Sequence, residues 1–291
     1  MTQRMVTLIA GPTASGKSEL ALKMAQKKNA VIINTDAMQV YDVLNILTAR
    51  PTKADTMIVP HYLYGYVNPA LSYSVGQWLR DVHKLLNTLR LRSLIFVGGT
   101  GLYFRALLGG VSEIPYIPDV IRQKWRTQLY EEGVESLYHQ LLQVDAAISK
   151  KISSQDGQRI VRALEVYEAT GKRLSWWQKQ KTTPLIVQDD LEKILLTPAR
   201  SLLYERINKR FDHMVEKGVL EEVVAMKRYA LSPLLPAMKA IGVPQFMAYL
   251  DGNTSFEDAI EAAKMQTRRY AKRQMTWFRN QFGGEWEHIS S

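Results

Sequence analysis

The chain has 291 residues, and 38 lysines and arginines against 28 aspartates and glutamates give it a formal charge of +10 at pH 7. It holds no cysteine, which excludes disulfides, thiolate zinc sites and cysteine nucleophiles. No apolar run approaches the ~20 residues that cross a bilayer, and no signal segment precedes the first predicted strand, so we expect a cytoplasmic protein. The basic excess suits a polyanionic partner, although many basic enzymes bind none.

The first predicted elements surround a phosphate-binding motif. An apolar strand at Val6–Ala10 leads into Gly11-Pro12-Thr13-Ala14-Ser15-Gly16-Lys17-Ser18, which fits G-x-x-x-x-G-K-[ST], and a helix follows from Glu19. This strand–loop–helix order is the context that a P-loop requires. Its backbone N–H groups face an anion, Lys17 adds a cation, and Ser18 supplies a hydroxyl ligand for Mg²⁺. The sequence therefore predicts a site for a di- or triphosphate.

Two later strand ends carry polar residues. Buried strands are predicted at Ala30–Asn34 and Ser93–Val97; the first is followed by Asp36, and the second by the loop Gly98–Tyr103. Ligands of open α/β sheets lie beyond the carboxyl ends of the strands, so we expect Asp36 and this loop at the edge that carries the P-loop. Asp36 has three interpretations: an indirect magnesium ligand, a general base, or an N-cap of the segment after it.

The remaining core elements are predicted in chain order. Residues 51–69 are expected to be an irregular connection with a short strand near Tyr62–Tyr66, and an amphipathic helix follows at about Ser74–Asn87. A fourth buried strand is predicted at Lys193–Thr197. Helices are then expected at Ser201–Lys217, Leu220–Leu231, Pro244–Leu250 and Phe256–Gln281.

A helical segment interrupts this core. Residues 115–190 contain no buried-strand pattern, and their apolar spacing predicts helices at Val120–Glu132, Val134–Leu142, Asp145–Ile152 and Gln155–Thr170. We therefore divide the chain into a first core part at 1–114, a helical insertion at 115–190 and a second core part at 191–291. The fold class is α/β, a parallel-sheet core with an α-helical insertion domain.

Three groups of basic residues could bind a polyanion. The insertion gathers six of them around Gln155–Gln158, which favours polyanion binding: Lys150, Lys151, Arg159, Arg162, Lys172 and Arg173. Arg206 and Arg210 lie four residues apart on one predicted helix face. Either Arg210 reaches the phosphate site, or the two arginines form a solvated basic face. The last helix interleaves cations with aromatic residues, which suits either a nucleic-acid contact or ordinary packing.

Four stretches of the chain together resemble one family, the bacterial type of tRNA dimethylallyltransferases, also called tRNA isopentenyltransferases. They are residues 11–18, 36–41, 98–103 and 267–277, and residues 158–166 and 240–242 are also similar. The resemblance implies transfer of a dimethylallyl group from dimethylallyl diphosphate to N6 of the adenosine just 3′ of the anticodon in tRNA, with Mg²⁺ as cofactor. It implies a monomer with a P-loop kinase-like core, whose helical insertion grips the anticodon arm.

The resemblance also implies roles for particular residues. Asp36 would take the proton from N6, Thr100 would assist near the reacting centre, and Lys17 and Arg210 would bind the diphosphate. Contacts with tRNA are implied for Asp36, Ala37, Met38, Gln39, Thr100, Arg122, Gln158, Arg159, Ile160, Val161 and Arg162. Ala37 stands where the family usually has serine, and Val243-Pro244 departs from the usual tyrosine and basic residue.

Two other functions fit a P-loop. One is an ATP-dependent kinase of a nucleoside or small metabolite, which leaves the basic insertion unexplained. The other is a non-catalytic RNA-binding protein with a vestigial loop. Transfer of label from dimethylallyl diphosphate to tRNA would separate the dimethylallyltransferase hypothesis from both of these alternatives.

Overall fold

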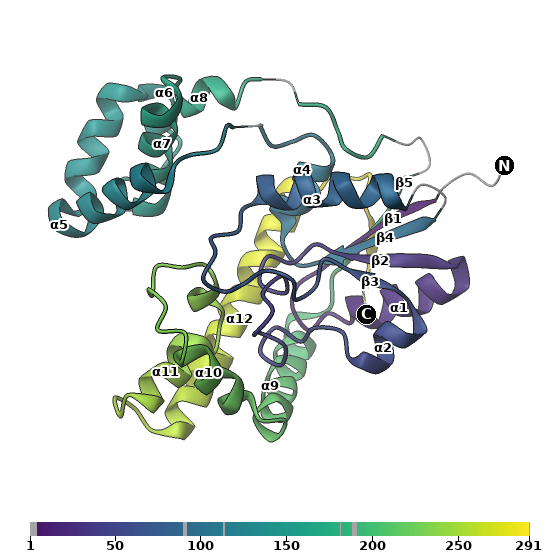
Figure 1. Ribbon diagram of the computed structural model, residues 1–291. Coiled ribbons are helices and arrows are strands. Elements are labelled where there is room, and N and C mark those ends of the chain that lie inside the picture. Colours follow the sequence, from purple (N-terminus) through teal and green to yellow (C-terminus); the bar gives the residue numbers. More distant parts are fainter. Residues whose placement is uncertain (1–4, 90–91, 113, 181, 188–190, 291) are drawn as a thin grey trace. The chain divides into compact units, whose positions relative to one another are not determined.

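The computed structural model describes residues 5–89, 92–112, 114–180, 182–187 and 191–290 (Figure 1). The chain forms two compact units, one of residues 1–104 with 186–291 and one of residues 105–185. The sequence predicted a helical insertion at 115–190 that binds tRNA. These boundaries, drawn for the tRNA-binding segment, stay a prediction. None of the helices among the described residues is long and apolar enough to cross a bilayer.

A parallel sheet forms the centre of the first unit. Its strand order is β3-β2-β4-β1-β5-β6, and every pairing is parallel. The strands are β1 (Val6–Ala10), β2 (Ala30–Asn34), β3 (His61–Tyr62), β4 (Ser93–Gly98), β5 (Leu191–Leu196) and β6 (Glu287–Ile289). All residues of β1 and β2 are buried, as expected for strands covered on both faces. The predicted α/β fold class is confirmed.

Helices cover the two faces of this sheet (Figure 1). On one face lie α1 (Lys17–Lys28) and α2 (Lys53–Ile58), and Ala21 and Ala25 of α1 pack against Ile9 and Ile95 of the sheet. On the other lie α3 (Val75–Thr88) and the first residues of α4 (Gly101–Leu107). The small alanine side chains let α1 approach the strands closely, which brings its N-terminus to the sheet edge.

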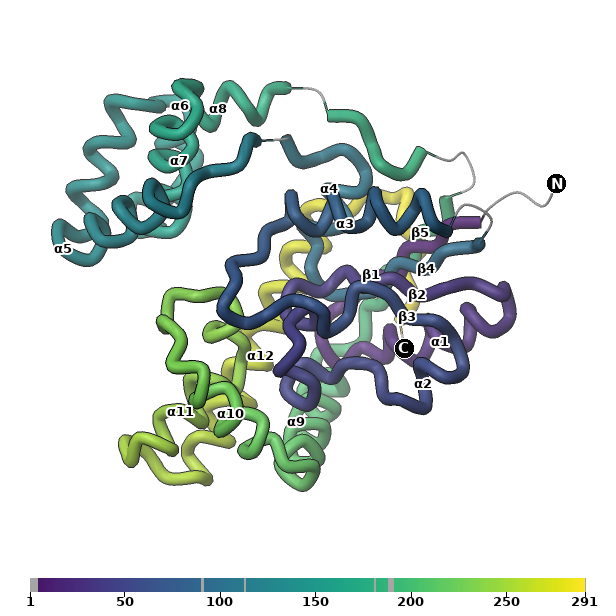
Figure 2. The backbone as a smooth tube through the Cα atoms, viewed as in Figure 1, coloured from purple at the N-terminus to yellow at the C-terminus, as the bar shows by residue number. Residues whose placement is uncertain are grey.

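The rest of the first unit is helical. It contains α9 (Arg200–Glu216), α10 (Val219–Lys227), the 3₁₀ turn η1 (Ala237–Lys239), α11 (Val243–Leu250) and α12 (Phe256–Gln281), which lie together in Figure 2. Their shared core includes Phe211, Val223, Phe246 and Ala263. This bundle packs on the segment after β2 through Val40 and Leu44, so it supports the loops at the sheet edge.

The second unit has its own hydrophobic core. It consists of α5 (Asp119–Val144), α6 (Ala146–Ser149), α7 (Gly157–Thr170) and α8 (Leu174–Trp177). Its core is formed by residues of α5, α6 and α7, including Leu137, Ile148 and Leu164. Gly133 interrupts α5 with φ 80° and ψ 170°, a conformation that suits glycine, and this explains why the sequence predicted two helices here.

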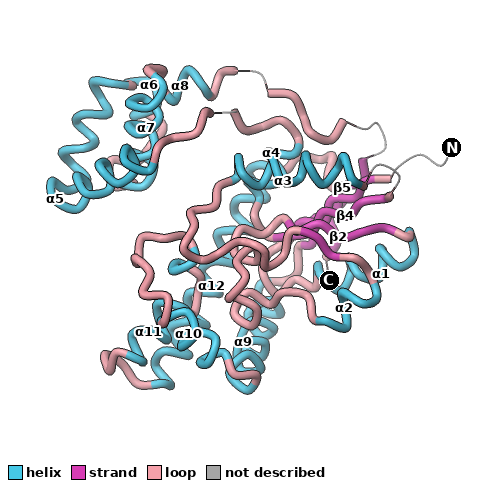
Figure 3. Tube along the Cα trace, in the orientation of Figure 1, coloured by secondary structure: helices cyan, strands magenta, loops and turns pink. Residues whose placement is uncertain are grey.

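Several short elements differ from the sequence prediction, among them the helix α4, which begins inside the predicted loop Gly98–Tyr103, and the turn η1. The connection at 51–69 contains α2, which a capping box between Thr52 and Asp55 starts, although Figure 3 shows that most of residues 35–74 are loop. The strand predicted at 62–66 is only His61–Tyr62. The helix α8 and the strand β6 were not predicted, because four and three residues are too few to show a period.

The loop after β2 is anchored by a carboxylate. Glu222 of α10 accepts hydrogen bonds from three consecutive backbone N–H groups, those of Asn45, Ile46 and Leu47, at 2.9, 2.6 and 3.0 Å. A loop cannot satisfy these groups from its own backbone, so the helix supplies the acceptor.

We therefore expect Glu222→Ala to lower the free energy of unfolding by about 2 kcal/mol, the range for hydrogen bonds to a charged group. Glu221→Ala is the matched control, because the neighbouring carboxylate is exposed, and it should cost less than about 0.5 kcal/mol. Urea denaturation at pH 7 measures both. Equal losses in the two variants would contradict the anchoring role.

Candidate active site

Three loops meet at the carboxyl edge of the sheet. Ala10 of β1 pairs with Gly98 of β4, and Asn34 of β2 pairs with Val97. The segments that follow, residues 11–18, 35–39 and 99–103, therefore begin at one level, as the sequence predicted. Thr100 N donates to the carbonyl of Thr35 at 3.2 Å, which joins two of these loops directly.

The P-loop has the geometry of a phosphate cradle. Gly16 has φ 88°, the left-handed region that glycine adopts without strain. At Gly11 a Cβ would lie 2.7 Å from Ser15 Oγ and 3.1 Å from Leu196 Cβ, so only glycine fits there. The loop closes with Ser15 N donating to the carbonyl of Pro12 at 3.2 Å. The N-terminus of α1 thus follows the loop directly, where its dipole favours an anion.

Two cations lie at this loop with little negative charge near them. Arg210 of α9 donates to Thr13 Oγ1 at 2.5 Å, and Lys17 Nζ donates to the carbonyl of Pro12 at 3.3 Å. Burial lowers the pKa of Lys17 to about 8; Asp36 opposes this shift and Arg210 adds to it. Burial also lowers the pKa of Arg210 to about 10, again opposed by Asp36. Both remain cations at neutral pH, so a multiply charged anion would offset their desolvation.

Of the two alternatives for Arg210, its contact with Thr13 favours the phosphate loop, and its binding of a phosphate stays a prediction. Arg206, one turn earlier on α9, instead lies near the carboxylates of Glu19 and Glu205, whose side chains are exposed. The pair therefore does not act as one basic face.

Asp36 is held by its neighbours in the loop. Asn34 is completely buried; its Oδ1 accepts from Asp36 N at 2.8 Å and its Nδ2 donates to the carbonyl of Asp36 at 2.9 Å. Asp36 Oδ1 accepts from Met38 N at 2.9 Å, a local turn of the kind that aspartate favours. No helix occurs in the described residues 37–52, so the N-cap interpretation of Asp36 is wrong.

Thr100 lies beside this carboxylate. Its Oγ1 accepts from Ala37 N at 3.0 Å, which fixes the residue after Asp36. Burial, and to a smaller extent the charge of Asp36, raises the pKa of Tyr270 on α12, while the side chains of Thr100 and Gln274 act to lower it. Tyr270 and Gln274 lie within the similar stretch 267–277, but no spacing in the sequence indicated that they join the edge.

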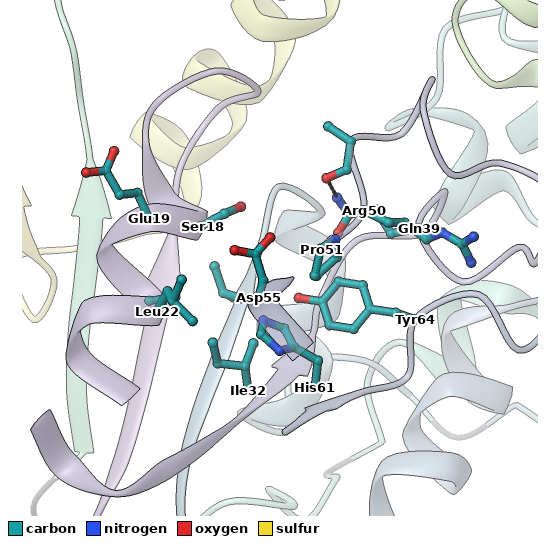
Figure 4. Close-up of a pocket in the computed structure, with 13 residues that line it drawn as sticks. Ser18, Glu19, Leu22, Ile32, Gln39, Arg50, Pro51, Asp55, His61 and Tyr64 are labelled. Atoms are coloured by element: carbon teal, nitrogen blue, oxygen red, sulfur yellow. Dashed lines mark hydrogen bonds between the residues drawn. The ribbon is translucent and has the colours of Figure 1, made fainter. Parts of the chain in front are cut away.

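A cavity of about 250 Å³ lies beside Ser18 (Figure 4). Its lining includes Ser18, Gln39, Asp55, His61 and Tyr64. Figure 4 shows the side chains of Ser18 and Asp55 directed toward the same space. Hydroxyl and carboxylate oxygens are the donors that Mg²⁺ prefers, and this ion takes only one or two protein ligands when a phosphate is present. The residues at Ser18 therefore fit a magnesium ion.

The residues predicted to contact tRNA have different environments. Ala37, Met38 and Gln39 are half-buried at the edge, and Gln39 Nε2 donates to the carbonyls of Thr48 and Ala49 at 2.8 and 3.2 Å. In the second unit, Gln158 and Arg159 are exposed on α7, while Arg122 and Arg162 are half-buried.

Two of those predicted contacts need correction. Ile160 and Val161 are 0% and 5% exposed and belong to the core of the helical unit. Their side chains support α7 and are not available to a surface ligand. Likewise Arg268 of α12 donates to Asn208 Oδ1 at 2.6 Å, which supports the packing interpretation for that cation of the last helix.

Comparisons with known proteins agree with this geometry. A family model described as IPP transferase matches residues 39–281, and one described as isopentenyl transferase matches residues 4–60. A tRNA dimethylallyltransferase of Bartonella tribocorum is 75% identical over 98% of this chain and 99% of its own length. One of Mesorhizobium japonicum is 52% identical over 97% and 88%.

Solved structures give the same result. A tRNA isopentenylpyrophosphate transferase of Bacillus halodurans superposes with a TM-score of 0.68 at 32% identity, covering 99% of this chain and 90% of that one. A eukaryotic dimethylallyltransferase, solved acting on tRNA, gives a TM-score of 0.83 at 28% identity, covering 99% and 74%.

The parallel sheet and its P-loop define an α/β protein of the P-loop NTPase-like class. The relatives cover almost the whole chain at high identity. The chain belongs to the tRNA dimethylallyltransferase family, as the resemblance indicated.

Arg210 provides a direct test of the phosphate site. We expect Arg210→Met to weaken binding of magnesium pyrophosphate about tenfold or more, because a hydrogen bond to a charged group contributes ~1.5–3 kcal/mol. Arg206→Met is the matched control from the same helix, and its affinity should stay within about twofold. Isothermal titration calorimetry measures both. An unchanged affinity in Arg210→Met would show that Arg210 does not bind pyrophosphate.

Proposed function

We propose that this protein transfers the dimethylallyl group of dimethylallyl diphosphate to N6 of the adenosine 3′ of the tRNA anticodon. The observation that carries the proposal is the arrangement at the sheet edge. A cradle with two desolvated cations adjoins a fixed carboxylate, so one half suits a leaving diphosphate and the other suits an amine nucleophile. The tRNA dimethylallyltransferase of Bartonella tribocorum and the eukaryotic enzyme solved acting on tRNA support tRNA as the acceptor.

The reaction breaks one bond and forms another at the same carbon. The C1–O bond of the allylic diphosphate breaks, and its electron pair leaves with the diphosphate. N6 of the adenosine forms the new bond to C1 and loses one proton. The exocyclic amine is a weak nucleophile, so the protein must mainly stabilise the charge that develops on the leaving group.

Named residues supply each part of this stabilisation. The N–H groups of residues 16–18 would face the diphosphate, since those of Thr13 and Ser15 already donate to Gln274 and Pro12. Lys17 and Arg210 add positive charge in surroundings where it is poorly screened. Asp36, with one oxygen held by Met38 N, orients N6 and accepts its proton. Thr100 keeps the carboxylate loop in place through Ala37 N.

A magnesium ion fits the same proposal as cofactor. When bound, Mg²⁺ would supply further positive charge to the diphosphate, and Ser18 would be its protein ligand. We also propose that the protein is a monomer and that it works in the cytoplasm, where tRNA is found.

The helical unit provides the proposed surface for the anticodon arm. Exposed Arg159 and Gln158 begin α7, with half-buried Arg162 one turn later, and cations of this kind pair with phosphates. Trp176 is 42% exposed and has the ammonium of Lys172 5.5 Å from its ring centre. Such a cation with an aromatic face suits a nucleic acid, whose bases stack and whose phosphates are negative.

Asp36→Asn tests the proposed base. Asparagine keeps the Oδ1 acceptor for Met38 N but cannot take a proton, so kcat should fall about 10²–10⁴-fold, the usual contribution of a general base. Asp42→Asn, an exposed carboxylate of the same loop, is the control and should keep its activity. The assay follows label from dimethylallyl diphosphate into unmodified tRNA in the presence of Mg²⁺.

The outcomes of this assay separate the alternatives. Full activity of Asp36→Asn would refute its role as base. If the wild type gives no labelled tRNA but phosphorylates a small acceptor with ATP, the kinase alternative replaces our proposal. Binding of tRNA with no transfer and no phosphorylation would indicate the non-catalytic alternative.

Arg159 tests the tRNA surface. Arg159→Gln should weaken tRNA binding and reduce the slope of log affinity against log salt by about one, as expected for one lost phosphate contact. Lys124→Gln is the control in the same unit, because Lys124 of α5 lies outside the predicted contacts 158–162. It is paired with Glu168 at 2.9 Å, as Arg159 is with Asp156 at 3.3 Å. Fluorescence titrations at several salt concentrations give both slopes. Equal slopes for wild type and Arg159→Gln would place the contact elsewhere.

A further inference from the structure

One buried amide joins the two halves of the site. Gln274 of α12 is 6% exposed. Its Oε1 accepts from Thr13 N at 2.9 Å, and its Nε2 donates to the carbonyl of Gly99 at 2.9 Å. Both ends of the side chain are thus used for backbone groups of different loops, although neither loop lies near it in sequence.

The two loops have different functions in the proposed reaction. Thr13 belongs to the P-loop, and its hydroxyl accepts from Arg210. Gly99 precedes Thr100, whose hydroxyl accepts from Ala37 N beside Asp36. Through one side chain, the cradle for the leaving group is therefore connected to the carboxylate that receives the proton.

The amide of Gln274 lies so close to Gly99 that a side chain at position 99 would collide with it. A Cβ at Gly99 would lie 2.2 Å from Gln274 Nε2 and 3.5 Å from Asp36 Oδ2. The amide therefore packs against the bare backbone next to the carboxylate.

We propose that Gln274 is a positioning residue for prenyl transfer that sets the separation between the diphosphate cradle and the Asp36–Thr100 pair. This inference rests on the proposed function. Transfer requires C1 to lie near N6 while the diphosphate stays in the loop, and a misplacement of about 1 Å can cost ~10²-fold in rate. Only an amide of this length accepts at one loop and donates at the other. Glutamate lacks the donor, and asparagine is one methylene shorter.

The same contacts would also stabilise the fold, so the test must distinguish the two roles. Misaligned enzyme lets water attack C1 in place of N6: the C1–O bond breaks, water oxygen bonds to C1 and loses a proton, and dimethylallyl alcohol forms. The ratio of alcohol to prenylated tRNA does not depend on how much enzyme is folded. Partial unfolding removes both products, whereas misalignment changes their ratio.

The experiment compares Gln274→Met with Thr267→Val. Methionine has nearly the volume of glutamine and removes both hydrogen bonds. Thr267 is the matched control: it is 8% exposed on the same helix, and its hydroxyl donates to Ala263 within that helix at 2.8 Å. Each variant is assayed with magnesium, dimethylallyl diphosphate and unmodified tRNA for kcat, KM and both products, and thermal unfolding is recorded.

We expect Gln274→Met to lower kcat about tenfold or more and to raise the ratio of alcohol to prenylated tRNA, with KM for tRNA within about threefold of wild type. Thr267→Val should lose stability and keep the wild-type ratio. A wild-type ratio and kcat in folded Gln274→Met would overturn the positioning role. If the wild type makes no prenylated tRNA, the proposed function is wrong. The inference about Gln274 is then wrong as well, because it rests on that function.

Discussion

Lys17 and Arg210 keep their charge at neutral pH in surroundings that have lost much of their water. Burial lowers the pKa of both groups, and Asp36 opposes the shift in each case. Holding like charges together in this way is unfavourable until an anion binds. The surrounding structure has to fix these groups in advance, because a loop free to relax would turn them out to solvent and lose the preorganised field.

The fixing is done by polar side chains that bind loop backbone. Asn34 holds Asp36, Glu222 holds residues 45–47, and Gln274 holds the two loops after β1 and β4. Two of these three come from the C-terminal helices, which contribute no strand to the edge. The bundle of α9 to α12 therefore supports the site, and Figure 1 shows α12 running from the bundle toward the sheet.

How well the sequence predicted the protein depends on the range of the contacts. The P-loop, the buried strands and the placement of Asp36 and Thr100 follow from local patterns and from the rule that parallel strands share a carboxyl edge. Gln274 was not predicted, because its partners lie 261 and 175 positions away and only the fold joins them. Ile160 and Val161 were given as tRNA contacts by resemblance, although their side chains lie in the core of the helical unit. The short strand β6 has too few residues to leave a pattern.

The central position of β1 affects how the chain is made. Val6 pairs with Leu94 on one side and with Leu191 on the other, so the middle strand of the sheet lacks one neighbour until residues 191–196 have left the ribosome. The contiguous unit 105–185 is complete before that moment and can fold while the nascent sheet still has an open edge. Closing such a long-range parallel pairing is slow, and an unpaired strand is a site of aggregation. The insertion of the unit 105–185 between β4 and β5 thus prolongs the interval in which a growing chain carries an unpaired strand edge.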